Sequence, residues 1–212
     1  MRGTTRMLDR RRDELAGGAE HLGWKVGFGS PAGMTGLGID RPLVGYLTTG
    51  RRLAPGSSVS VAGWTRGVIE AEIAAYVGLG LAVEGWALAI ELADVDPPPD
   101  DIEEIVAGNV YHRHVLFGDR VVALPDERGV RVRRDGEEVA ATSDPDELVG
   151  DLGWVLATTA STLAAAGDEL RQGDVVITGS MIPPMAVAPG QTWEVSAPGL
   201  GSIAVHLTAM AG

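Results

Sequence analysis

The sequence contains no cysteine, few aromatic residues and a single lysine. Without cysteine, disulfide bonds, thiolate metal sites and cysteine nucleophiles are excluded. Aromatic residues make up 5% of the chain, whereas it has 30 glycines and 12 prolines, which favours many turns and short elements over a helical bundle. The longest apolar stretch, residues 73–83, is too short to span a bilayer, and residues 1–15 contain no apolar core of a secretory signal. We therefore expect a cytoplasmic protein.

Basic residues are also scarce relative to acidic ones. The 212 residues include 17 Lys and Arg against 29 Asp and Glu, which gives a net charge of −12. Nucleic acids and anionic membranes would repel such a chain, so neither is an expected partner. The hydrophobic share of 45% is that of an ordinary globular protein and suffices for one large core. We expect a short helical segment over residues 1–20 and a single domain over residues 21–212.

Apolar periodicity and turn residues predict a β-rich chain with a few helices. Residues 67–79 form an apolar run with two embedded acids, and because Gly67 and Gly78 bracket the run we prefer a strand to a helix. Residues 86–94 repeat the pattern with one embedded acid. The other expected elements are a helix over 5–19, a short helix over 102–108 capped by Asp100 or Asp101, a charged hairpin over 120–140 turning at Asp135-Gly136, a helix over 144–170, a strand over 174–180, and a hairpin over 191–207 turning at Pro198-Gly199.

The lone lysine, Lys25, is the first functional signal. Lysine is a compact ammonium that can exchange its proton, whereas the arginine guanidinium effectively cannot. A chain that uses arginine for all its other cationic side chains and keeps one lysine points to a chemical role for Lys25. The alternative is that one lysine survived by chance.

Glu70 and Glu72 form the sharpest local pattern. Residues i and i+2 of a strand lie on the same face, so these two carboxylates point the same way while Ile69, Ala71 and Ile73 fill the opposite face. Two carboxylates on an otherwise apolar strand repel each other and resist desolvation. A hard divalent cation with oxygen ligands would relieve both costs.

Glu91, in the apolar run 86–94, is the candidate third ligand. Three carboxylates from two strands would leave coordination positions open for water and substrate, as a catalytic Mg²⁺ or Mn²⁺ requires. The alternative is that each glutamate lies on a solvated face, which is common in a chain this acidic.

His112 and His114 are two residues apart and could face one site together. The alternative is that they are surface histidines or hydrogen-bonded core histidines. The sequence contains no HExxH zinc pattern, no GxSxG, no P-loop and no GxGxxG that opens a helix after a strand. Serine-triad hydrolases, NTPases and dinucleotide-dependent enzymes therefore lose support.

Taken in order, six segments resemble the fumarylacetoacetate hydrolase superfamily, and most closely its branch of 2-oxopent-4-enoate hydratases and 4-oxalocrotonate decarboxylases. The resemblance covers roughly residues 20–208. The segments are GWKVGFGS (23–30), GIDRPLVGYL (38–47), IEAEIA (69–74), AIELAD (89–94), GDVVITGS (173–180) and GLGSIAV (199–205).

The resemblance implies a fold, a metal and a set of site residues. The fold would be α+β and β-rich, a mixed β-sandwich or roll of the fumarylacetoacetate hydrolase C-terminal type with a few flanking helices, which makes residues 21–212 a catalytic domain. The metal would be Mg²⁺ or Mn²⁺, held by Glu70, Glu72 and Glu91. Lys25 falls on the lysine of the family's G-x-K-x-G motif, a residue that binds substrate or handles a proton.

Other matched or altered positions concern the substrate pocket. Gly179 and Ser180 match a Gly-Ser turn expected to contact the substrate. The family's DNAS-type segment reads GNVYHRH here, which keeps Asn109 and gains His112, Arg113 and His114 as candidate substrate-binding or acid–base residues. Leu43 stands where hydratases of the branch carry an acid, which favours a decarboxylase.

The main hypothesis is a metal-dependent lyase, a decarboxylase or hydratase, acting on an enolisable 2-oxo acid through a metal-stabilised enolate. Its partner would be a small anionic 2-oxo acid, and since family members are commonly homo-oligomers we expect at least a homodimer. One alternative is a C–C bond hydrolase of acylpyruvates, whose histidine would be His21 or one of the pair His112 and His114. The other is a non-catalytic partner subunit of a related enzyme.

Overall fold

Two long antiparallel strands with embedded acids organise the molecule. In the computed structural model, which describes residues 2–96, 101–126, 129–144 and 146–210, these are β5 (Gly67–Val77) and β6 (Val83–Asp94). Ile69 and Ala71 of β5 are buried in an apolar cluster, and so are Ile90 and Leu92 of β6. The intervening residues point to the opposite face, as strand geometry requires. The predicted strands over 67–79 and 86–94 are confirmed.

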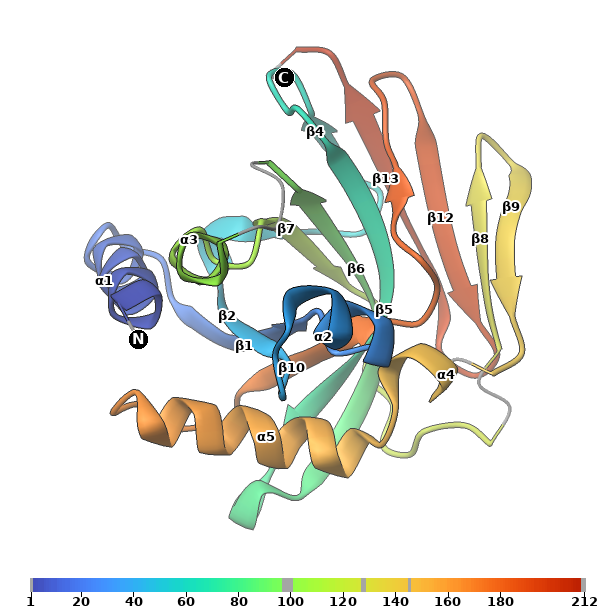
Figure 1. The fold of residues 1–212 in the computed structure, drawn as a ribbon. Coiled ribbons are helices and arrows are strands. Elements are labelled where there is room, and N and C mark those ends of the chain that lie inside the picture. Colours follow the sequence, from blue (N-terminus) through green and yellow to red (C-terminus); the bar gives the residue numbers. More distant parts are fainter. Residues whose placement is uncertain (1, 97–100, 127–128, 145, 211–212) are drawn as a thin grey trace.

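The larger sheet is mixed and places β5 near its centre. β10 runs antiparallel to β5 and parallel to β1, so three distant parts of the chain lie side by side (Figure 1). In spatial order the strands are β2 (Leu43–Thr48), β1 (His21–Gly27), β10 (Val175–Ser180), β5, β6, β7 (His112–Phe117) and β3 (Arg52–Leu53), with β11 (Met185–Ala186) pairing with β5.

The smaller sheet packs on one face of the larger one. The cluster around Ile69 and Ile90 also contains Val132, Val195 and Val205 from the smaller sheet, so this apolar layer joins the two sheets. The strands of the smaller sheet are, in spatial order, β4 (Ser58–Ser60), β13 (Gly201–Thr208), β12 (Thr192–Ala197), β8 (Val130–Arg134) and β9 (Glu137–Thr142). The expected β-rich α+β architecture is confirmed.

The larger sheet curls, and most of the helices lie on the side of the molecule away from the smaller sheet (Figure 1). A second apolar cluster joins them to the sheet, with Met7, Ile105 and Leu163 from the helices and Trp24 and Tyr46 from the strands. The helices are α1 (Arg2–Ala16), α2 (Pro31–Leu37), α3 (Ile102–Ala107), α4 (Asp146–Val149) and α5 (Leu152–Ala165), and short 3-10 turns cover Thr49–Arg51 and Leu79–Leu81.

The predicted helix over 144–170 is interrupted. Gly150 adopts φ 74°, and the Asp151 side chain accepts a hydrogen bond from the backbone N–H of Trp154, so α4 ends and α5 begins here. Residues 147–165 are long and apolar enough to cross a membrane by length and composition alone. The 14 residues of α5 span about 21 Å, less than the roughly 30 Å of a bilayer core. Val155 and Leu163 of α5 instead pack into the second cluster.

Local turn and cap predictions hold at three places. Asp101 caps α3 through its side chain, whereas Asp100 lies outside the described residues. Asp135 and Gly136 join β8 to β9, although this hairpin covers 130–142 rather than 120–140. The hairpin of β12 and β13 turns between Ala197 and Gly201, as predicted.

Candidate metal centre

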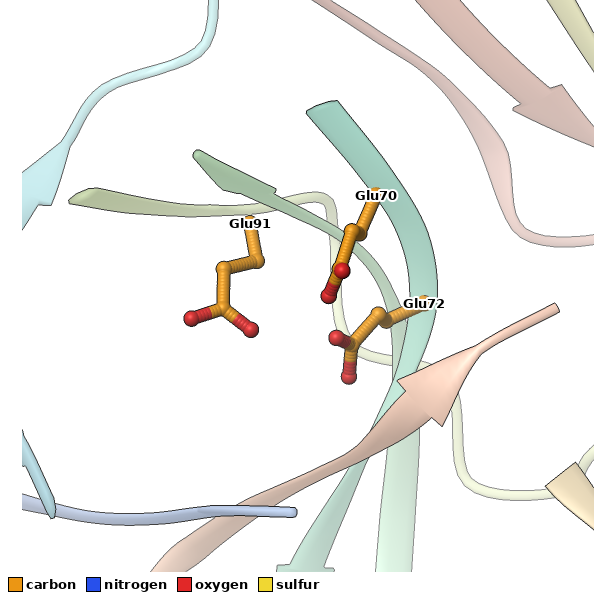
Figure 2. Close-up of side chains that lie close together, drawn as sticks. All are labelled: Glu70, Glu72 and Glu91. Atoms are coloured by element: carbon orange, nitrogen blue, oxygen red, sulfur yellow. The ribbon is translucent and has the colours of Figure 1, made fainter. Parts of the chain in front are cut away.

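Three glutamates converge on the face of the larger sheet opposite the smaller one. Glu70 and Glu72 extend from β5 and Glu91 from β6, with their carboxylates turned toward one another (Figure 2). The register of the two strands sets Glu70 directly opposite Glu91. One oxygen of each lies within 4.8 Å of the others. The structure thus brings together all three predicted ligands.

Two buried carboxylate oxygens in this cluster have no hydrogen-bond partner among the described residues. They are Oε1 of Glu72 and Oε2 of Glu91. The second oxygen of Glu72, Oε2, accepts a hydrogen bond of 2.8 Å from the backbone N–H of Gly179. Buried polar atoms rarely stay unpaired, and hard divalent cations take carboxylate oxygens as ligands. The donor set therefore fits Mg²⁺ or Mn²⁺.

The lone lysine lies beside this cluster. Lys25 is 2% exposed, and its Nζ lies 2.6 Å from Oε1 of Glu91 and 3.0 Å from the carbonyl oxygen of Val110. His112, also buried, places Nδ1 2.8 Å from the same Glu91 oxygen. Glu91 is consequently the best-partnered carboxylate of the three.

The acids differ in their proton affinity for this reason. Burial raises the pKa of Glu70 to about 7, with Glu91 adding to the shift, and burial also raises the pKa of Glu72 well above its usual range. Burial alone would raise the pKa of Glu91 too, but Lys25 and His112 outweigh it and lower that pKa. The three acids in turn overcome the burial of Lys25 and raise its pKa, so the lysine is charged.

A strained turn fixes the partners of Glu91. Asn109, Val110 and Tyr111 have φ values of 60°, 50° and 65°, a left-handed conformation that costs about 1–2 kcal/mol per residue. The Asn109 side chain holds the turn to β2: its Oδ1 accepts the backbone N–H of Tyr46, and its Nδ2 donates to the carbonyl oxygen of the same residue. The turn directs the Val110 carbonyl to Lys25 and leads directly into His112.

A cavity of about 240 Å³ opens onto the cluster. Lys25, Glu70, Gly179 and Ser180 line it together with mostly apolar neighbours. The Ser180 hydroxyl donates to the carbonyl oxygen of Ile182 at 2.6 Å. The apolar side chains around the cavity come from Val26, Phe28, Ala93, Val95, Val110, Tyr111, Leu148, Val149, Ile182 and Pro184.

Comparison with known proteins identifies the family. Residues 37–208 match the family described as fumarylacetoacetate (FAA) hydrolase, C-terminal. The chain belongs to this family. It is 30% identical to a 4-oxalocrotonate decarboxylase of Pseudomonas putida, over 94% of this chain and 81% of the relative, and 30% identical to a 2-keto-4-pentenoate hydratase of Burkholderia vietnamiensis (strain G4 / LMG 22486), over 90% and 79%.

A solved structure of similar length has the same fold. The 4-oxalocrotonate decarboxylase from Pseudomonas putida G7, complexed with magnesium and adipate, superposes with a TM-score of 0.84 at 24% identity, covering 95% of this chain and 83% of that one. The resemblance drawn from the six sequence segments is therefore confirmed.

The two neighbouring histidines do not face one site together. A bulge in the pairing of β6 with β7 sets His112 opposite Ala93 and His114 opposite Leu92, which are consecutive residues and point to opposite faces. His112 therefore reaches Glu91, whereas His114 stacks on Trp64 with ring centroids 6.2 Å apart. The expectation from i, i+2 spacing was wrong because it assumed a regular strand.

Arg113 and His114 lie away from the cavity. Both line a separate, open hollow, where Arg113 pairs with Asp94 at 3.1 Å. Burial, with His112 nearby, lowers the pKa of His114 to about 4, so its ring is neutral. Their predicted roles with substrate stay predictions, and these positions do not support them.

Three other sequence expectations concern residues outside the cavity lining. Asn109 is buried with its amide bonded to Tyr46, and Leu43 packs in the second apolar cluster. His21 lies at the start of β1, 3.2 Å from Asp174. Leu43 therefore does not line the cavity and does not help to distinguish a decarboxylase from a hydratase. His21 does not line it either, so its position does not support the hydrolase hypothesis.

Sequence reasoning missed the left-handed turn and the apolar wall contributed by α4. The pair Gly108-Asn109 was a usable signal, because Asn favours the left-handed region and Gly often ends a helix. The contact of the Val110 carbonyl with Lys25 has no sequence signal, since every residue carries a carbonyl. Leu148 and Val149 were assigned to one long helix, and their place at the cavity depends on the break at Gly150.

Proposed function

We propose that the protein is a divalent-metal-dependent lyase, a decarboxylase or hydratase, that acts on an enolisable 2-oxo acid. The observation that carries this proposal is the cluster of three glutamates beside a buried lysine at the end of a small cavity. Two of its buried oxygens have no hydrogen-bond partner among the described residues. Relatives named 4-oxalocrotonate decarboxylase and 2-keto-4-pentenoate hydratase, matched over 79–81% of their length, support it.

Glu70, Glu72 and Glu91 would hold the cation. A bound Mg²⁺ or Mn²⁺ supplies Lewis-acid polarisation of a 2-oxo group. Gly179 holds one oxygen of Glu72, and Lys25 with His112 holds one oxygen of Glu91. The other oxygen of each has no hydrogen-bond partner in the part of the chain that the structure describes. The chain thereby sets the ligand oxygens before any cation arrives, which lowers the cost of ordering them.

Lys25 would bind the substrate carboxylate and hold a proton near it. It is the only cationic side chain among the described residues that line the cavity. Its charged ammonium, held by Glu91 and the Val110 carbonyl, still has a third N–H to donate. Ser180 and Gly179 would contact the substrate at the same end of the cavity, as the sequence predicts.

The apolar lining of the cavity supports a substrate with a single carboxylate. Phe28, Val95, Tyr111, Leu148 and Ile182 are among the lining residues, and no second cation lies among those that the structure describes. A second carboxylate placed there would lose its hydration without gaining a partner. We therefore propose a monocarboxylate with an apolar tail. In competition assays, 2-oxopentanoate should bind at least about tenfold more tightly than 2-oxoadipate, and the reverse order would contradict this preference.

The decisive experiment compares two Glu→Gln variants. With Mg²⁺, the wild type should hydrate the monocarboxylate 2-hydroxypenta-2,4-dienoate faster than it decarboxylates the dicarboxylate 4-oxalocrotonate. Glu72→Gln should abolish both turnover and metal binding because it removes a ligand charge. Glu137→Gln, on the exposed strand β9, is the matched control and should behave as the wild type. Wild-type activity in Glu72→Gln would overturn the metal mechanism.

The same assays separate the alternatives. Turnover of acylpyruvates alone would assign a C–C hydrolase, although no histidine lies among the described residues that line the cavity. Metal binding without any turnover would assign a non-catalytic subunit.

We further propose a cytoplasmic homo-oligomer whose residues 21–212 form one catalytic domain. Sedimentation velocity of the purified protein tests its oligomeric state.

A further inference from the structure

The two hydrogen-bond donors near Glu91 share one of its oxygens. Lys25 Nζ and His112 Nδ1 approach Oε1 at 2.6 and 2.8 Å, and Oε2 has no partner among the described residues. A carboxylate with both donors on one oxygen cannot rotate without breaking two charge-assisted hydrogen bonds. Its second oxygen therefore keeps a fixed direction, and one Glu91 oxygen lies within 4.8 Å of an oxygen of each of Glu70 and Glu72.

The histidine itself is held rigidly. Its side chain is fully buried, and it follows directly on the left-handed turn that Asn109 fastens to Tyr46. Because Nδ1 faces a carboxylate oxygen at 2.8 Å, Nδ1 carries the ring hydrogen and donates it. Nε2 is then an acceptor, and it has no partner among the described residues.

His112 is not placed to react with a substrate. It is absent from the described residues that line the cavity, and the carboxylate of Glu91 occupies the side on which Nδ1 points. An acid or base must come within hydrogen-bond reach of the proton it moves. The ring can act only through Glu91.

We propose that His112 is a positioning residue: its Nδ1–H holds Oε1 of Glu91 so that Oε2 is presented to a divalent cation between the three acids. This inference rests on the metal centre of the proposed function. Hydrogen bonds behind a metal ligand orient that ligand, and their loss typically weakens metal affinity about 10–100-fold.

Two amide variants of similar polarity test the position of the donor. In His112→Asn the side-chain nitrogen can occupy the place of Nδ1, whereas in His112→Gln it extends to the place of Nε2. We expect metal-free His112→Asn to bind Mn²⁺ within about threefold of the wild type by calorimetry, and His112→Gln to bind it about 10–100-fold more weakly. At saturating metal, the His112→Gln substitution should lower kcat by a larger factor than it raises KM. Equal Mn²⁺ affinity in the two variants would overturn the proposal.

A measurement on the wild type covers the case in which a variant does not fold. Nitrogen NMR of the His112 ring should show the Nδ1–H tautomer, and its Nδ1 resonance should shift as Mg²⁺ is added. An Nε2–H tautomer, or a resonance that Mg²⁺ leaves unchanged, would overturn the proposal. Metal binding by the wild type without turnover of any 2-oxo acid would instead remove the proposed function and leave the His112 result standing.

Discussion

Glu91 on β6 and the pair Glu70 and Glu72 on β5 are neighbours in one cluster, yet their environments differ. Two donors, Lys25 and His112, serve one oxygen of Glu91 and lower its pKa, whereas the pKa values of Glu70 and Glu72 are raised by burial and by neighbouring carboxylates. The β6 side is therefore ionised in the metal-free protein, and the β5 side becomes fully ionised only when a cation arrives. Metal binding should accordingly release protons from β5.

The largest effect should come from removing the charge on β6. Glu91→Gln leaves the buried Lys25 ammonium without its carboxylate, and breaking a buried pair in this way costs about 3–5 kcal/mol. Urea unfolding of the metal-free protein measures the loss. In the matched variant Glu72→Gln, the metal-free protein should be as stable as the wild type or more stable. Gln keeps an acceptor for the Gly179 N–H and removes a carboxyl whose ionisation burial already disfavours. Equal losses in both variants would refute the difference between the strands.

Metal binding should raise the unfolding free energy of the wild type but not that of Glu72→Gln. At a free Mg²⁺ or Mn²⁺ concentration of about 100 times its Kd, the wild type should gain about 2.7 kcal/mol in unfolding free energy. Glu72→Gln should gain nothing, since the cluster then lacks one of its anions. Thermal unfolding with and without a chelator measures both values, and a wild type insensitive to metal would contradict the assignment of the cluster.

The pH dependence of the stability of the metal-free protein should be set by the carboxyl groups of β5. Folding raises the pKa of Glu70 from 4.5 to about 7, so the folded metal-free protein binds this proton more tightly than the unfolded chain does. Its stability should therefore fall as the pH rises from about 4.5 to about 7. The loss should be on the order of 2 kcal/mol, because solvent screens a carboxyl that is partly exposed. Mn²⁺ affinity should rise over the same range. Glu70→Gln should flatten the stability curve, and a curve that keeps its slope would assign it to other groups.

The smallest effect is expected next to His112, at Arg113. Arg113 is exposed and pairs with Asp94 outside the cavity, so Arg113→Ala should leave Mn²⁺ affinity unchanged. Calorimetry on Arg113→Ala beside His112→Gln makes the comparison. Loss of metal affinity in Arg113→Ala would mean that the influence of β7 on the cluster is not confined to His112.

Local rules sufficed for parts of the fold and of the site. Period-two alternation set Glu70 and Glu72 on one face with Ile69 and Ala71 on the other, because successive strand residues alternate regardless of their partners. Asp101 capped its helix for an equally local reason. Alternation failed at His112 and His114, since a bulge depends on the pairing with β6 and has no mark in the sequence of β7 itself.

The sequence by itself determined which residues can carry the chemistry: three glutamates in apolar runs, one lysine, and the segment order of a known family. Only the tertiary structure decided how they are paired. Lys25 and Glu91 are 66 residues apart and His112 and Glu91 are 21 apart, so their contacts depend on strand register and on the left-handed turn at Asn109. Burial among these partners then sets which carboxylate is ionised. The free energy of a charge removed from water depends on its neighbours, whereas its residue type alone does not fix it.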